Sequence, residues 1–122
     1  MDDDKQTELN KRIRVLHDKY CSQLPDKYQE IEDYWLAYQS DPCNSEHIDT
    51  FYRLIHTLKG TAATFGFTSQ SDICFEIQQC LIQAKEKHVA LNTDEIKKIQ
   101  SHINELKINI LEPAKHFPGQ PD

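Results

Sequence analysis

The stretch His56-Thr57-Leu58-Lys59-Gly60-Thr61-Ala62-Ala63-Thr64-Phe65-Gly66-Phe67 lies near the middle of the 122-residue chain and is its most informative segment. On a helix that turns about 100° per residue, the apolar residues here and just before fall on one stripe, the face that a bundle buries: Ile48, Phe51, Ile55, Leu58, Ala62 and Phe65. His56 lies off that stripe. Lys59 and Gly60 share its side of the helix, because positions three and four apart are surface neighbours.

These three residues predict a histidine that carries a phosphoryl group. A glycine inside a helix costs roughly 1 kcal/mol relative to alanine, so we expect Gly60 to have a compensating role, which is to let a large planar group approach the His56 ring. Lys59 suits a phosphoryl group because an ammonium pairs with phosphate oxygens. An exposed imidazole is a competent nucleophile and forms covalent intermediates.

The run from His56 to Phe67 resembles the signature of histidine-containing phosphotransfer (HPt) domains of two-component phosphorelays. The residues that match the signature are His56, Leu58, Lys59, Gly60, Ala62, Ala63 and Gly66. The match is close over about a dozen residues, and elsewhere it depends on the number and length of the helices. The resemblance implies that His56 accepts a phosphoryl group from the phosphoaspartate of a receiver domain, or passes it back to one. It also implies that the receiver supplies Mg²⁺ and most of the catalysis, so the chain is a carrier rather than an enzyme and has no cofactor.

Further candidates surround His56 in this interpretation. Related domains place an amide or carboxylate opposite the histidine, where we expect Gln78, with Gln79 as the neighbouring candidate. Such a partner fixes the orientation and tautomer of the ring. The alternative for Gln78 is a solvated polar side chain on a helix surface. For docking of the partner protein we expect four residues: Tyr52, Arg53, Ala63 and Phe67.

Apolar periodicity along the chain predicts an all-α fold. Residues 7–24 carry a thin stripe of Leu9, Ile13, Leu16 and Tyr20, which indicates an additional N-terminal helix packed across the bundle. Pro25 with Asp26 indicates the start of the next helix, since proline suits a first turn. This helix would extend to about residue 39 and bury the following residues: Tyr28, Ile31, Trp35 and Tyr38.

Three more helices follow a cluster of helix-breaking residues at 40–45. Asn44 or Ser45 would cap the helix that carries His56, and Gly66 would end it, with Phe67 folded back on the apolar face. The others would span about 68–87 and 93–111, and Pro113 would end the last. Their predicted core residues are Ile73, Phe75, Ile77, Cys80, Leu81, Ala84, Ile96, Ile99, Ile103, Leu106, Ile110 and Leu111. Short connections predict an antiparallel up-down-up-down four-helix bundle over residues 7–112, with flexible residues 1–6 and a flexible tail or linker at 113–122.

Composition limits the other classes of function. The net charge of −6 argues against a nucleic-acid binder. Within this negative chain, the cations Arg53 and Lys59 form a local basic patch near His56, which suits a partner with an acidic active site. No apolar run is long enough for a membrane span or a signal peptide, so we expect a cytoplasmic protein, most simply a monomer. The four cysteines have no Cys-x-x-Cys spacing and are expected to be reduced. The histidine spacing predicts no metal site.

One alternative of another class remains open. The chain could be a non-catalytic helical interaction module in which His56 is simply exposed and Gly60 permits close packing of helices. Transfer of phosphate from a charged receiver domain to His56 distinguishes the two interpretations.

Overall fold

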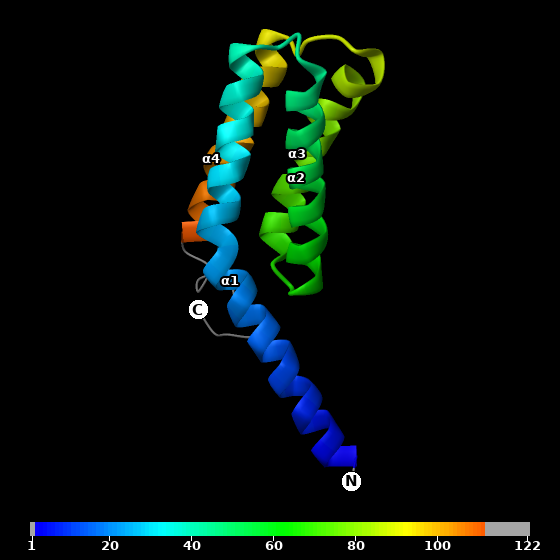
Figure 1. Ribbon diagram of the computed structural model, residues 1–122, viewed down its shortest axis with the longest axis vertical. Coiled ribbons are helices and arrows are strands. Elements are labelled where there is room, and N and C mark those ends of the chain that lie inside the picture. Colours follow the sequence, from blue (N-terminus) through cyan, green and yellow to red (C-terminus); the bar gives the residue numbers. More distant parts are fainter. Residues whose placement is uncertain (1, 112–122) are drawn as a thin grey trace.

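The computed structural model describes residues 2–111 and contains four α-helices in that range (Figure 1). They are α1 (Asp2–Ser40), α2 (Ser45–Thr64), α3 (Thr68–Lys87) and α4 (Thr93–Leu111). Each helix packs against the next, and α1 also packs against α4, which closes the bundle. No strand occurs among the described residues. The predicted all-α four-helix bundle is therefore confirmed. Residues 2–6 form the first turns of α1, and the expected tail at 113–122 lies outside the described residues.

The N-terminal segment is helical as expected, but it is not a separate helix, because α1 continues through Pro25. Proline lacks an N–H and its ring clashes with the carbonyl four residues back, which normally kinks or ends a helix. Here the residues on both sides of Pro25, Leu24 and Tyr28, are buried in the core, and this packing holds the helix together. The two parts of α1 run in different directions in Figure 1, as expected for a helix with an internal proline.

The sequence predicted that the first part of α1 packs across the bundle, and this prediction is wrong. This part of the helix projects beyond the end of the bundle, in blue in Figure 1. Leu9, Ile13 and Leu16 are about half exposed, and Tyr20 is the first residue of this stripe that is buried. The thin stripe was predicted correctly, but no other helix among the described residues reaches far enough to cover it.

The core consists of the stripes predicted for the other helices. Five residues of α2 are buried as expected: Ile48, Phe51, Ile55, Leu58 and Ala62. Trp35 is also buried, and its indole N–H donates to Oε1 of Gln100 at 2.8 Å, which joins α1 to α4. Two predicted core residues, Phe75 and Leu111, are instead exposed.

The helix ends follow the local sequence. The Asn44 side chain accepts a hydrogen bond from the Glu46 N–H at 3.0 Å and so caps α2. Gly66 has φ of 81°, the left-handed conformation that glycine adopts at helix ends without strain. The chain therefore turns sharply after α2, and Phe67 folds back into the core as predicted.

Candidate functional site

His56 lies on the side of α2 that faces α3 and is exposed. Its Nδ1 is 2.9 Å from the amide nitrogen of Gln78 on α3, within hydrogen-bond distance. Gln78 is only 4% exposed, so its amide approaches the ring from inside the bundle. No described residue hydrogen-bonds Nε2. The arrangement holds the inner nitrogen and leaves the outer one open, while Gln79, the neighbouring candidate, is exposed.

One aromatic ring and one cation, from Tyr52 and Lys85, lie on one side of His56. The Tyr52 ring lies parallel to the His56 ring, with centroids 6.2 Å apart and an interplanar angle of 5°. The Lys85 ammonium, on α3, lies 4.9 Å from the centroid of the Tyr52 ring, a cation–π contact. Lys85 thus brings a second positive charge to the His56 side of the bundle.

Lys59 lies on the other side of His56, one turn further along α2. Its ammonium is 5.6 Å from the centroid of the Phe75 ring on α3. Phe75 is 46% exposed, a large fraction for a phenyl ring in a small bundle. Lys59 and Phe75 therefore form one continuous surface across α2 and α3.

Gly60 faces open space. A Cβ built on it would have no heavy atom within 4 Å apart from its chain neighbours and its own helix backbone. Among residues 2–111 the glycine is therefore not needed for packing, which removes one part of the alternative interpretation. Ala63, one turn further on, is exposed. No large side chain of Gly60 or Ala63 therefore protrudes from α2 beside His56.

We call this surface the His56 face and define it by these residues: Tyr52, His56, Lys59, Gly60, Ala63, Phe75 and Lys85. Phe67, which we expected here, does not belong to it, because the turn at Gly66 folds its ring into the core, where it is 1% exposed. Phe75 and Lys85 were not predicted as site residues, and Phe75 was expected in the core. Their positions, three residues before and seven after Gln78, place them on its side of α3 and were the available signal.

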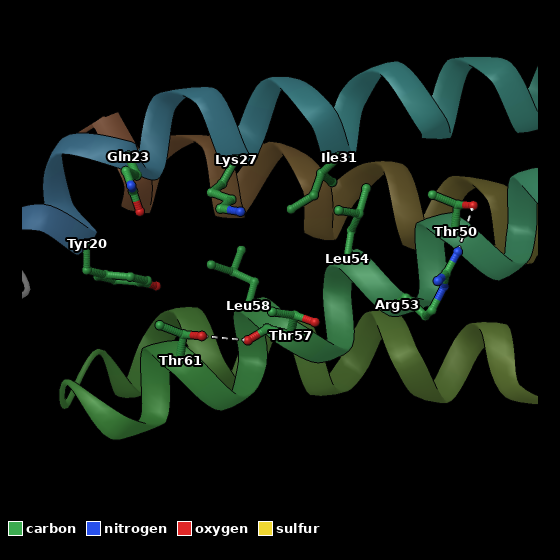
Figure 2. Close-up of a pocket in the computed structure, with 10 residues that line it drawn as sticks. All are labelled: Tyr20, Gln23, Lys27, Ile31, Thr50, Arg53, Leu54, Thr57, Leu58 and Thr61. Carbon is green, nitrogen blue, oxygen red and sulfur yellow. Dashed lines mark hydrogen bonds between the residues drawn. The ribbon is translucent and has the colours of Figure 1, made fainter.

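Arg53 lies on a different surface, the groove between α1 and α2 shown in Figure 2. This groove has a volume of about 550 Å³, and residues from both helices line it, among them Tyr20, Lys27 and Leu54. The Arg53 guanidinium donates a 3.4 Å hydrogen bond to the Thr50 hydroxyl. His56 does not line the groove, and no described contact joins the Arg53 side chain to His56, although the two lie three residues apart on α2.

The cysteines offer no competing nucleophile beneath the site. All four are free thiols. Burial raises the pKa of Cys74 on α3 to about 12, against a smaller lowering by Lys59. A thiol with so high a pKa stays protonated near neutral pH and is a poor nucleophile. Among residues 2–111 no three histidine, cysteine or acidic side chains gather as metal ligands. No helix in that range has the length and apolar character of a membrane span.

Comparison with known proteins identifies the family of this chain. The family model described as "Hpt domain" matches residues 15–108. The chemotaxis protein CheA of Halobacterium salinarum is 31% identical over 64 residues, which cover 52% of this chain and 10% of the relative. CheA of Salmonella typhimurium is 30% identical over 82 residues, 67% of this chain and 12% of the relative. The chain therefore spans about a tenth of the length of these relatives.

A solved structure shows the same fold. The CheA phosphotransferase domain from Thermotoga maritima superimposes with a TM-score of 0.71, covering 84% of this chain and 96% of that one at 24% identity. The family match extends over most of the chain and includes all of α2 and α3. The protein therefore belongs to the Hpt domain family, the histidine phosphotransfer domains of two-component signalling.

Proposed function

We propose that His56 is the phosphoacceptor, and that it exchanges a phosphoryl group with the phosphoaspartate of a receiver domain. The observation that carries this proposal is the hydrogen bond between Gln78 and Nδ1 of His56, which leaves Nε2 open on an exposed residue. A positioned nucleophile needs one fixed nitrogen and one accessible nitrogen. A cytoplasmic location stays part of the prediction.

In the transfer step, the Nε2 lone pair attacks the phosphorus of the acyl phosphate. A P–N bond forms, the P–O bond to the aspartate breaks, and the carboxylate leaves with the electron pair. The attacking nitrogen must carry no proton. A half-turn of the Gln78 amide presents Oε1 to the ring and stabilises the tautomer whose single proton is on Nδ1, so that Nε2 keeps its lone pair, since an amide has a donor and an acceptor side. Gln78 can thus hydrogen-bond either neutral tautomer of the His56 ring.

Charge neutralisation supports the role of Lys59. Phosphoryl transfer depends on positioning and on cations that stabilise the equatorial oxygens. Lys59 lies one turn from His56 and, together with Lys85, makes this face locally basic in a chain of net charge −6. We expect the receiver to contribute Mg²⁺ and its acidic pocket, so that the carrier needs no cofactor of its own.

The docking surface in this proposal is the His56 face, with Tyr52, Ala63 and Phe75 as its apolar part. Protein interfaces combine an apolar centre with polar surroundings. Exposed Phe75 beside Lys59 fits that description, and it replaces the buried Phe67 of the sequence prediction. Exposed Arg53 lines the adjoining groove, and it joins the docking surface where a partner extends over the edge of that groove.

The direct test uses receiver domains charged with acetyl phosphate that carries a radioactive label. The expected result is label on this chain that is lost in acid and survives alkali, as phosphohistidine does. His56→Gln abolishes it. His88→Gln, which changes another exposed histidine, leaves it intact and is the matched control. Label that persists in His56→Gln, or no label with any receiver of the host, would leave the interaction-module alternative in its place.

A further inference from the structure

The N-terminal part of α1 carries an apolar stripe that the bundle does not cover. We call residues 2–19 the α1 extension. Every side chain from residue 3 to residue 16 is exposed. The apolar residues Leu9, Ile13 and Leu16 are 50%, 49% and 54% exposed and lie on one side of the helix. Figure 1 shows that this part of α1 projects beyond the other helices.

The stripe continues the core-facing side of α1. Leu9, Ile13, Leu16 and Tyr20 follow at alternating intervals of four and three residues, the spacing of a coiled-coil seam. Beyond Tyr20 the same side of the helix is buried in the bundle, from Leu24 to Tyr38. In the bundle this side packs against helices, so another helix fits the uncovered part. A strip one seam wide is also too narrow for a membrane-bound helix, which needs a broad apolar face.

Charge indicates what kind of helix fits. Lys5, Arg12 and Lys19 recur every seven residues and line one edge of the stripe. The described contacts of this edge include one ion pair, Arg12 with Glu8 at 3.8 Å. Both partners are well exposed, and such a pair contributes little and is easily exchanged. A second copy of this chain would place the same cations along its own edge, so it is a poorer match than an acidic partner.

We propose that the α1 extension binds an amphipathic helix of a partner protein, with apolar residues in its seam and Asp or Glu along the facing edge. The complex would be a short intermolecular coiled coil next to the bundle. This surface is separate from the His56 face, so the proposal does not depend on phosphotransfer. The chain alone would remain a monomer.

The test uses two synthetic peptides of three heptads with leucine seams, one with Glu and one with Lys at the flanking positions. Fluorescence anisotropy with the full chain should show binding of the Glu peptide and none of the Lys peptide. Ile13→Asp should weaken binding by roughly tenfold or more, because it places a charge in the seam. It should leave the thermal midpoint unchanged, because Ile13 lies outside the core. Charge reversal of Lys5, Arg12 and Lys19 to Glu should reverse the preference between the peptides.

Several outcomes would overturn the proposal. Failure to bind the Glu peptide would do so, as would equal binding of both peptides. Association of the chain with itself in sedimentation velocity would make a second copy the occupant. Stronger binding to phosphatidylserine vesicles than to the Glu peptide would make a lipid surface the occupant. If only a variant that lacks residues 113–122 binds the peptide, the tail of this chain is the occupant.

Discussion

Ile55 and His56 are neighbours in sequence, yet one lies on the core side of α2 and the other on its exposed side. Ile55 has no exposed area and belongs to the core, whereas His56 is exposed and contacts α3 through one buried amide. On the core side of α2, each side chain is constrained by packing. On the His56 side, a glycine has open space around its missing Cβ. The difference suggests that stability and phosphotransfer depend on separate residues of the same helix.

The largest effect should come from the core side. Phe51→Ala removes a ring that is 1% exposed and packs against Trp35, with centroids 5.4 Å apart. We expect a loss of about 3–5 kcal/mol in the free energy of unfolding, measured by urea denaturation. Arg53→Ala, an exposed change on the same helix, should stay within about 0.5 kcal/mol. The phosphorylation of the folded fraction should be retained in Phe51→Ala. If Phe51→Ala proves too unstable, Ile55→Val should cost about 0.5–1.5 kcal/mol.

The core side should also respond to alkali. Burial raises the pKa of Cys74 from 9.0 to about 12, so the folded chain holds this proton more tightly than the unfolded chain. The contribution of protonated Cys74 to the free energy of unfolding is fully present below pH 9. It falls as the pH rises towards 12, by at most roughly 4 kcal/mol. Burial raises the pKa of Tyr20 as well, so this residue also lowers the free energy of unfolding as the pH rises.

Urea denaturation between pH 8 and 11 measures this effect. Cys74→Ala should flatten the dependence, whereas Cys43→Ala, at an exposed thiol, should not. A dependence that is equally steep in both variants would contradict the assignment to Cys74.

Lys59 should affect transfer and not stability. Lys59→Met keeps most of the aliphatic stem and removes the charge. Because a charge-assisted hydrogen bond contributes about 1.5–3 kcal/mol, phosphoryl transfer from a charged receiver should slow by roughly ten- to a hundredfold. Lys87→Met, at an exposed lysine near the end of α3, is the matched control. Unchanged transfer in Lys59→Met would mean that the cation next to the phosphoryl group comes from elsewhere, with Lys85 as the first candidate.

Sequence periodicity predicted the bundle because each buried stripe belongs to one helix and needs no knowledge of its neighbours. The helix break at Pro25 was wrong, because the burial of Leu24 and Tyr28, which local sequence does not reveal, outweighs the cost of the proline. His56, Lys59 and Gly60 could be found from spacing on one helix. For Phe75 and Lys85 the sequence offers only their spacing from Gln78 on α3, because their proximity to Lys59 and Tyr52 depends on how α3 packs against α2.

Gly60 gives the smallest and most discriminating effect. Its Cβ would meet nothing within 4 Å, so Gly60→Ala should raise the free energy of unfolding by about 0.5–1 kcal/mol, the difference in helix propensity. Ala62→Gly, two residues on and fully buried, should lower it by at least as much. Transfer should respond differently: slightly slower in Gly60→Ala and much slower in Gly60→Leu, because the added side chain occupies the space through which the receiver approaches His56.

Two results would each break the comparison between the sides of α2. A loss of stability in Gly60→Ala would mean that the site is constrained by packing after all. Normal transfer by Gly60→Leu, with stability retained, would mean that the open space is not the approach to His56. A more stable variant that transfers more slowly would show that this glycine is kept for access to the ring and at a cost to the helix.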